Sequence, residues 1–255
     1  MSEPVADSCK ICLKDLHKSF GPKMVLDGAS LRIAERESVV VIGGSGTGKS
    51  VLLKHIIGLL RPDRGTVEVD GVDISTLSRT EITRFRRRFG MSFQEGALFD
   101  SMSVKENIGF PLKRAGQQPD QVAARVEECL RLVRLTGVAD KMPSQLSGGM
   151  RRRVGFARAI ALKPDIVLFD EPNTGLDPVN KAMIDELIID MRTDLGSTTV
   201  TITHDMRSAF RIADRVAMLY QGRIIAVAPP AEFRELSDPR VQQFIHGLAE
   251  GPLTS

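Results

Sequence analysis

Residues 43–50 have the sequence Gly-Gly-Ser-Gly-Thr-Gly-Lys-Ser, which is the pattern of a phosphate-binding P-loop. The β-branched run at residues 39–42 comes directly before it and predicts a buried strand. Apolar residues follow it at helical spacing, at positions 52, 53, 56, 57 and 60, and they predict a helix. The loop therefore lies between a strand and a helix, as the motif requires, which argues against an ordinary glycine-rich turn.

The glycines of this loop allow consecutive backbone N–H groups to turn inward and form an anion-binding nest. The N-terminus of the following helix adds its partial positive charge. Lys49 can then reach the β- and γ-phosphates of a nucleotide, and the Ser50 hydroxyl can ligate Mg²⁺. We predict a nucleotide site formed by Gly43, Gly44, Ser45, Gly46, Thr47, Gly48, Lys49, Ser50 and Val51.

The chain has 255 residues, of which 42% are hydrophobic and 26% charged, as in an ordinary soluble globular protein. The formal net charge of +3 is small, and no basic stretch is interleaved with aromatic residues, so we expect no nucleic-acid partner. The arginine-rich runs at residues 84–88 and 151–153 are interpreted as solvated helix faces or a docking rim.

No stretch approaches the roughly 18 apolar residues of a membrane helix. The first residues lack the basic and apolar regions of a signal peptide, so we expect a cytosolic, reduced protein. Cys9 and Cys12 form a CxxC on a predicted strand, where positions three apart face opposite sides. We therefore expect these cysteines to serve strand packing and not a metal or redox site.

Strand patterns dominate the first 75 or so residues, helical patterns extend from residue 80 to about 163, and strands return at 166–169, 198–203, 216–219 and 224–227. This alternation around a P-loop predicts an α/β fold with a mostly parallel sheet, an N-terminal antiparallel β subdomain and an inserted helical arm. We assign about 10–94 and 161–230 to the core and β subdomain, and about 95–160 to the arm. Residues 237–255 form the tail, in which Asp238 and Pro239 begin an amphipathic helix. Three contacts are open for the apolar face of that helix: its own domain, a second copy of the chain, or a partner protein.

A nucleotide hydrolase needs a second anchor for Mg²⁺ and a group that activates water. The sequence Ile-Val-Leu-Phe-Asp-Glu at residues 166–171 is an apolar strand that ends in two carboxylates. Asp170 would hold Mg²⁺ through water, and Glu171 faces the other way and could act as the general base. The alternative is a pair of acidic residues that cap the turn before Pro172.

The sequence Leu-Ser-Gly-Gly-Met at residues 146–150 resembles the signature motif of ABC-type ATPases. The resemblance implies the ABC ATPase fold for one domain that spans residues 1–255, and ATP as cofactor. It also implies that Ser147, Gly148 and Gly149 bind the ATP held by an opposite subunit, so that two copies close head to tail around two ATP molecules. Hydrolysis then releases the closed dimer.

Other elements of the family follow in order. Gln94 resembles the Q-loop glutamine that contacts Mg²⁺ and the attacking water, and Asp177 resembles the D-loop residue at the dimer interface. His204 resembles the switch histidine that contacts the γ-phosphate, although a structural histidine is the alternative. Phe20 stands where the family places an aromatic ring against adenine, with a buried strand-end phenylalanine as the alternative.

Two positions depart from the pattern of the family. Met150 replaces the signature glutamine, and Asn173 stands where many relatives have Thr or Ser. Neither change removes a phosphate or Mg²⁺ contact, so we still expect ATP hydrolysis.

The resemblance implies that the chain drives separate integral-membrane permease subunits. Their docking surface would be the cleft beside the Q-loop, lined by Phe93, Gly96, Ala97, Leu98, Phe99 and Met102. The alternative is that these residues form the core of the helical arm.

Residues 93–100, 146–154 and 241–252 are most similar to the Mla/MCE-type lipid-transport ATPases of bacteria. That similarity implies phospholipid transport between inner membrane and periplasm, which maintains outer-membrane lipid asymmetry. It also implies a place on the cytoplasmic face of the inner membrane, with an MCE-domain lipid-binding protein and a STAS-domain regulator as partners. One alternative is the ATPase subunit of an amino-acid or other small-solute importer. The other is a non-transport ABC mechanoenzyme, which the lack of a coiled-coil insertion and of a basic field disfavours.

Overall fold

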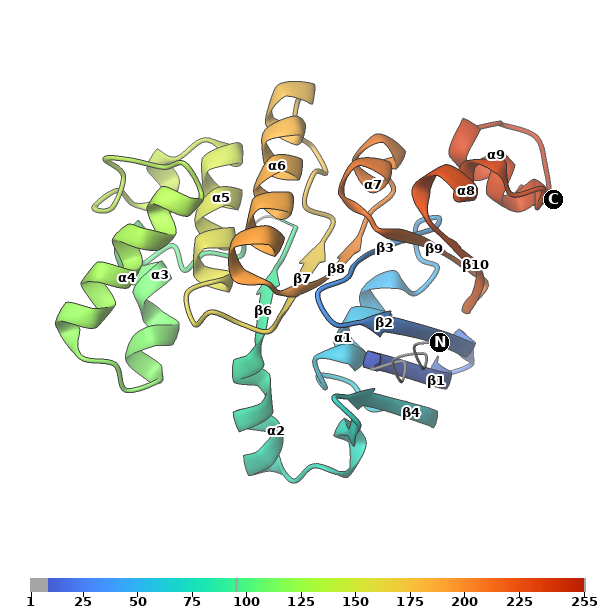
Figure 1. The fold of residues 1–255 in the computed structure, drawn as a ribbon, viewed down its shortest axis with the longest axis horizontal. Helices are drawn as coiled ribbons and strands as arrows, with labels where there is room; N and C mark the ends of the chain where they lie inside the picture. Colours follow the sequence, from blue (N-terminus) through green and yellow to red (C-terminus); the bar gives the residue numbers. More distant parts are fainter. Residues whose placement is uncertain (1–8, 95, 255) are drawn as a thin grey trace, which may run out of the picture. The chain divides into compact units, whose positions relative to one another are not determined.

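The computed structural model describes residues 9–94 and 96–254 (Figure 1). These residues form two compact units. The first unit contains the described residues as far as Ile82 together with those from Ile202 onward. The second unit contains residues 83–201.

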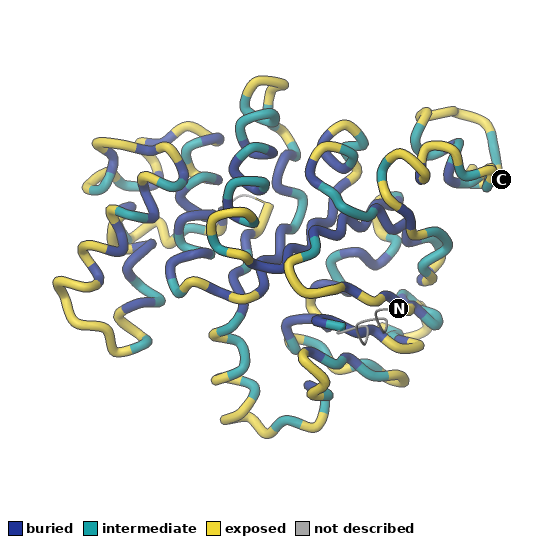
Figure 2. The backbone as a smooth tube through the Cα atoms, viewed as in Figure 1, coloured by how far each residue is buried: buried dark blue, intermediate teal, exposed yellow. Residues whose placement is uncertain are grey.

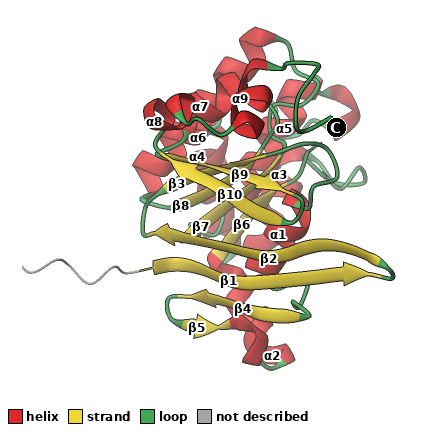
Figure 3. Cartoon of the chain, turned by 90° about the vertical axis from the view of Figure 1, so that its right-hand side faces the viewer, coloured by secondary structure: helices red, strands yellow, loops and turns green. Residues whose placement is uncertain are grey.

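An antiparallel sheet in the first unit has the strand order β2-β1-β4-β5, which Figure 3 shows side by side. Its strands are β1 (Cys9–Phe20), β2 (Lys23–Ala34), β4 (Arg64–Val69) and β5 (Val72–Asp73). The buried side chains of β1 change phase at a bulge, because Ile11, Leu13 and Leu16 are all buried. The register with β2 shifts between Leu13 and Leu16, where Asp15 has a φ of +50°.

The two cysteines of β1 form a disulfide, so the prediction that Cys9 and Cys12 serve only strand packing is wrong. Their Cα atoms lie 5.9 Å apart. Three residues of regular extended chain would span roughly 10 Å. A register shift between Cys9 and Ile11 distorts the start of β1 and brings the two side chains together.

The turn at Asp70 and Gly71 joins β4 to β5. Both residues have positive φ, +49° and +74°. This backbone conformation matches the right-handed twist of two strands joined by a two-residue loop.

A second sheet contributes the strands β10-β9-β3 to the first unit. These are β3 (Ser38–Ile42), β9 (Arg215–Tyr220) and β10 (Arg223–Ala228). β3 pairs in parallel with β9, and β9 pairs antiparallel with β10. All five residues of β3 are buried, which Figure 2 shows and which the continuous apolar run predicts. The helices of this unit are α1 (Lys49–Ile56), η1 (Ile74–Thr76), α7 (Met206–Ile212), α8 (Pro230–Glu235) and α9 (Pro239–His246), and α2 (Arg79–Phe85) contains the boundary between the units.

The C-terminal helix begins at Pro239 after the cap Asp238, as predicted. The Arg240 guanidinium hydrogen-bonds the Asp238 carboxylate and lowers the pKa of that group to about 2. Val241 is fully buried, so α9 packs within its own chain. The tail folds back over the helix, because buried Gln243 donates to the Leu248 carbonyl and accepts from the Leu253 N–H.

The second unit contributes the neighbouring strands β8-β7-β6, of which β6 and β7 pair in parallel. Their bounds are β6 (Phe89–Ser92), β7 (Ile166–Asp170) and β8 (Thr198–Ile202). The helices are η2 (Arg86–Arg88), α3 (Val104–Arg114), α4 (Pro119–Leu132), η3 (Pro143–Gln145), α5 (Gly148–Ala159) and α6 (Pro178–Leu195). The predicted strands at 166–169 and 198–203 are thereby confirmed within one residue at their C-terminal ends.

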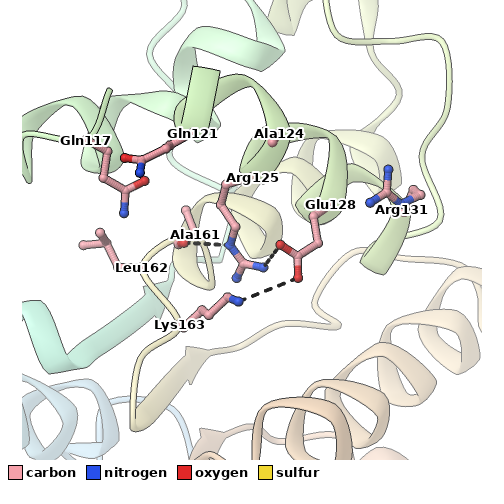
Figure 4. Close-up of a pocket in the computed structure, with 9 residues that line it drawn as sticks. All are labelled: Gln117, Gln121, Ala124, Arg125, Glu128, Arg131, Ala161, Leu162 and Lys163. Atoms are coloured by element: carbon pink, nitrogen blue, oxygen red, sulfur yellow. Dashed lines mark hydrogen bonds and ion pairs between the residues drawn. The ribbon is translucent and has the colours of Figure 1, made fainter. Parts of the chain in front are cut away.

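The helices α3, α4 and α5 pack against one another (Figure 1). Buried Arg125 of α4 donates to the Ala161 carbonyl (Figure 4) and to the Ile160 carbonyl, both at the end of α5. Its guanidinium also pairs with Glu128 at 2.8 Å and lowers the pKa of that carboxyl. A cation at this position satisfies the last carbonyls of α5 and complements the negative end of its dipole.

Burial of His55 in α1 should make the free energy of unfolding depend on pH. His55 is fully buried, and its Nδ1 donates to the Val51 carbonyl at 2.7 Å. Burial lowers the pKa of His55, and the charge of Lys18 lowers it further. The hydrogen bond to Val51 and the charge of Asp63 raise this pKa, but the net shift is downward. The unfolded chain then binds a proton first as the pH falls below about 6.5. The free energy of unfolding should therefore fall with pH from there downward, until the folded form is protonated as well.

Denaturant titrations of the wild type and of His55→Leu at pH 5, 6 and 7 measure this contribution. The substitution should reduce the pH slope of the unfolding free energy by up to about 1.4 kcal/mol per pH unit. His246→Leu, at the exposed end of α9, is the matched control. Equal slopes for wild type and His55→Leu would contradict the prediction.

Candidate active site

The predicted site residues lie in both units. The first unit carries Phe20, residues 43–51 and His204. The second unit carries Gln94, residues 147–149, Asp170, Glu171 and Asp177.

The P-loop connects β3 to α1, as the sequence predicts. Gly43 has a φ of +153°, and a Cβ at this position would overlap the carbonyl oxygen of Leu219. Gly48 has a φ of +104° at the N-cap of α1, where a Cβ would lie 3.0 Å from the Val25 carbonyl oxygen. Both positions therefore require glycine, because of backbone conformation and of space.

Lys49 is the first residue of α1, and its side chain is buried. The ammonium group donates to the carbonyls of Gly43 and Gly44 at 2.8 and 2.9 Å. The Thr47 hydroxyl donates to the same Gly44 carbonyl at 2.9 Å. These bonds hold the lysine charge over the loop, next to the backbone N–H groups at the start of the helix.

Phe20 and His204 are both exposed. Phe20 ends β1 with 47% of its surface accessible, so it is not a buried strand-end phenylalanine, and the ammonium of Lys18 lies 5.8 Å from its ring centroid. His204 follows Thr203, whose N–H donates to the Val41 carbonyl of β3 at 3.2 Å. This bond places the His204 segment beside the strand that leads into the P-loop.

In the second unit, β7 ends at Asp170, and the chain then turns sharply at Glu171. Glu171 has a φ of +50°, which is costly for a residue with a side chain and is typical of functional sites. The Thr174 hydroxyl donates to the Glu171 carboxylate at 3.1 Å. Asn173 is buried and donates to the buried carboxylate of Asp185 in α6 at 2.7 Å, so this departure from the family pattern has a structural partner.

The signature residues form the N-terminus of α5. Ser147 is its N-cap and accepts from the Met150 N–H at 3.3 Å. Because this bond uses the backbone of Met150, it does not need the glutamine of the family pattern. A Cβ on Gly149 would lie 3.0 Å from Asn180, and Asn180 in turn bonds Asp177, the exposed N-cap of α6. The structure thus brings the signature residues next to the start of α6. Hydrogen bonds from the side chain and then from the backbone of Asn180 hold the pKa of Asp177 below its usual value.

Arg152 is a site residue that the sequence analysis missed. Only 8% of this residue is exposed, so the interpretation of residues 151–153 as a solvated face or docking rim is wrong for Arg152. Its guanidinium donates to the carbonyls of Gln94 at 2.8 Å, of Pro172 at 3.0 Å and of Thr174. Helical spacing could have found it, because Gly149, Arg152 and Phe156 share the buried stripe of α5.

The residues beside Gln94 expose two aromatic rings, Phe93 at 39% and Phe99 at 43%. The Phe99 ring contacts Phe110 at 5.1 Å between centroids, and the Arg158 guanidinium lies 5.6 Å from it. Arg158 also donates to the Gly96 carbonyl at 2.9 Å. We call Phe93 and Phe99 the exposed phenylalanine pair. Neither ring is buried as core of the helical arm would be.

Neither a metal-binding cluster nor a membrane-spanning helix is found in the described ranges. Residues 9–94 and 96–254 contain no cluster of three or more His, Cys, Asp or Glu that could hold a metal ion. In the same ranges, the helices are all too short or too polar to cross a membrane.

Comparison with known proteins places these motifs in a family. A family model described as ABC transporter matches residues 26–174. The probable ribonucleotide transport ATP-binding protein Mkl of Mycobacterium leprae (strain TN) is 41% identical over 94% of this chain and 70% of its own length. The intermembrane phospholipid transport system ATP-binding protein MlaF of Escherichia coli (strain K12) is 38% identical over 94% of this chain and 90% of its own. The chloroplastic protein trigalactosyldiacylglycerol 3 of Arabidopsis thaliana is 40% identical over 94% and 74%.

A solved structure agrees with these relatives. It is a dimeric ATP-binding cassette in a post-hydrolysis state with ADP and Pi, and it matches 86% of this chain and 98% of its own at 32% identity, with a TM-score of 0.79. The predicted fold class, an α/β ABC ATPase fold with a mostly parallel sheet and an antiparallel sheet, is therefore confirmed. The chain belongs to the ABC transporter family and is an ATP-hydrolysing member of it.

Proposed function

We propose that this chain is the ATPase subunit of a complex that moves phospholipid between the inner membrane and the periplasm, and so maintains outer-membrane lipid asymmetry. The observation that carries this proposal is the 38% identity to MlaF, which extends over 90% of that phospholipid transport protein. The relative from Arabidopsis, whose name also contains a lipid, supports it from a distant organism.

The second candidate is transport of a small solute. It is favoured by the name of the Mycobacterium relative, a probable ribonucleotide transport protein at 41% identity. The match covers 70% of that relative, against 90% of MlaF, so we rank lipid transport first.

In either case we propose that the chain acts as a head-to-tail dimer on the cytoplasmic face of the membrane, held there by permease subunits. The exposed phenylalanine pair supports a permease contact, because exposed aromatic rings suit the apolar core of an interface. An MCE-domain lipid-binding protein and a STAS-domain regulator would complete the lipid-transport complex.

The proposed ATP site uses residues of one copy for binding and chemistry. Phe20 stacks on adenine, and residues 43–51 bind the phosphates with Lys49 on the β- and γ-groups. The oxygen of a water molecule forms a bond to the γ-phosphorus while the bond from that phosphorus to ADP breaks. The water proton passes to Glu171, which leaves ADP and inorganic phosphate. Gln94 and His204 orient the water and the γ-phosphate.

The proposed Mg²⁺ ligands are Ser50, Gln94 and Asp170. A hydroxyl, an amide oxygen and a carboxylate are all hard oxygen donors, so this set fits Mg²⁺. When bound, Mg²⁺ neutralises charge on the β- and γ-phosphates.

The signature residues of the opposite copy complete the site. Ser147, Gly148 and Gly149 lie at the N-terminus of α5, a helix of 12 residues whose first N–H groups suit the γ-phosphate of the partner's ATP. Asp177 caps α6 and lies in the same part of the unit, where it would contact the dimer partner.

Replacement of Lys49 tests the phosphate site. Lys49→Ala removes an ammonium group from the phosphates, and loss of such a charged hydrogen bond should weaken ATP binding about 10- to 100-fold. Fluorescent-nucleotide titration measures Kd, and phosphate release measures turnover. Lys54→Ala, on the exposed side of the same helix, is the control. Unchanged ATP affinity and turnover in Lys49→Ala would contradict the assignment of residues 43–51 as the phosphate-binding loop.

Replacement of Glu171 tests the general base. Glu171→Gln keeps the shape of the side chain but cannot accept the water proton, so kcat should fall by about 100-fold or more while ATP still binds. Gel filtration with ATP should then show a trapped dimer. Near-normal turnover would exclude Glu171 from this role.

Purification from native membranes tests the cargo. Tagged Glu171→Gln should co-purify in detergent with a permease, an MCE-type protein and phospholipid, all identified by mass spectrometry. Phe99→Ser should lose the permease, whereas Leu59→Ser, at an exposed apolar residue of the first unit, should retain it. A small-solute permease without lipid would favour the second candidate. Ribosomal or DNA-bound partners, with no membrane protein, would overturn the transport proposal.

A further inference from the structure

Arg152 joins three elements of the second unit through one buried side chain. The residue belongs to α5, the helix that begins with the signature residues. Its Nε donates to the Gln94 carbonyl, and its two Nη atoms donate to the carbonyls of Pro172 and Thr174. One guanidinium therefore fixes the backbone of the Q-loop and the backbone of the turn that follows Glu171.

The shape of the guanidinium makes this link rigid. Its N–H groups form a planar fork, so the three carbonyl acceptors keep a fixed arrangement relative to one another. A lysine ammonium is a compact charge on a flexible stem and imposes no such plane. Movement of the α5 backbone at Arg152 must then move the turn, or break hydrogen bonds of a buried side chain.

The turn that Arg152 fixes is the strained one. Glu171 has a φ of +50°, and such backbone persists only where the surroundings over-determine it. Pro172 and Thr174, two of the next three residues, are the ones whose carbonyls Arg152 bonds. The Thr174 hydroxyl in turn bonds the Glu171 carboxylate at 3.1 Å. Arg152 therefore acts on the catalytic side chain through the backbone of its own turn.

Arg152 also lies close to the nucleotide-facing end of its helix. It follows Gly148, the first residue of α5, by four positions, which is about one helical turn. A displacement of Ser147 to Gly149 by a phosphate would therefore reach Arg152 through a single turn of helix.

We propose that Arg152 is a positioning residue that couples contact at the signature residues to the placement of Glu171. This inference rests on the proposed roles of Glu171 and of the signature residues. In the dimer, α5 contacts the ATP bound to the partner, and Glu171 hydrolyses the ATP bound to this chain. Arg152 links these two ATP molecules through one side chain.

A double-mutant cycle on the full-length chain tests the coupling. Arg152→Met keeps an unbranched apolar stem as far as the ε position but removes every donor, and we expect kcat to fall about 10- to 100-fold with KM for ATP within about 3-fold. Arg152→Lys retains a charge and an ammonium that can bond one or two of the three carbonyls, and it should recover about half of the loss on a logarithmic scale. Arg131→Met, the same change at an exposed site on α4, is the control and should match the wild type.

The cycle is completed in the Glu171→Gln background, with single-turnover rates measured from labelled ATP. If Arg152 acts through Glu171, Arg152→Met should change the residual rate by less than about 2-fold there. A loss as large as in the wild-type background would overturn the proposal, and so would an effect on KM alone. If Arg152→Met does not fold, the same cycle with Arg152→Lys decides the question by the same criterion. Near-normal turnover of Glu171→Gln by itself would instead contradict the general-base assignment, which separates the two failures.

Discussion

Close approach of backbone to backbone at the P-loop is the constraint on which the first unit depends. The parallel register of β3 and β9 pairs Ile42 with Met218, so the next residues, Gly43 and Leu219, come into contact. A side chain at position 43 would overlap the Leu219 carbonyl, and the loop would have to leave the position that the sheet gives it. The anion-binding conformation is therefore a consequence of strand register as well as of the glycines in the motif.

Arginines that are buried or half-buried have the corresponding role in the second unit. Each of three arginines donates to a main-chain carbonyl. Arg125 does so at the end of α5, Arg152 at the turn after β7, and Arg158 at the loop after Gln94. Loops and helix ends carry carbonyls that no regular ladder satisfies, and a guanidinium supplies several donors in one plane. Burial lowers the pKa of Arg158, which remains a cation because the unperturbed value of arginine is so high. The loop at Gln94 and the turn after Glu171 are in this way bonded to the helix that begins with the signature.

Local sequence was sufficient to predict the elements whose residues are close in the chain. β3 and α9 follow from an apolar run and from a cap with a proline, and the structure has both within one residue of the predicted starts. The disulfide of Cys9 and Cys12 was not predictable, because it depends on a register shift against β2. The role of Arg152 was hidden by the neighbouring arginines, since composition suggested a solvated run and only helical spacing separates the buried member from exposed Arg151. The combination of the two units into one ATP site follows from the resemblance to the family and remains a prediction.

The turn after β7 is held from two sides, and this explains why a residue that departs from the family pattern fits there. Arg152 holds the carbonyls of Pro172 and Thr174 from α5, and Asn173, between them, reaches Asp185 of α6. The buried carboxylate of Asp185 needs a donor, and the amide of asparagine extends further from the backbone than the hydroxyl of serine or threonine. The same segment continues to Asp177, which starts α6. Bonds from α5 and from α6 thus hold the residues that directly follow strained Glu171.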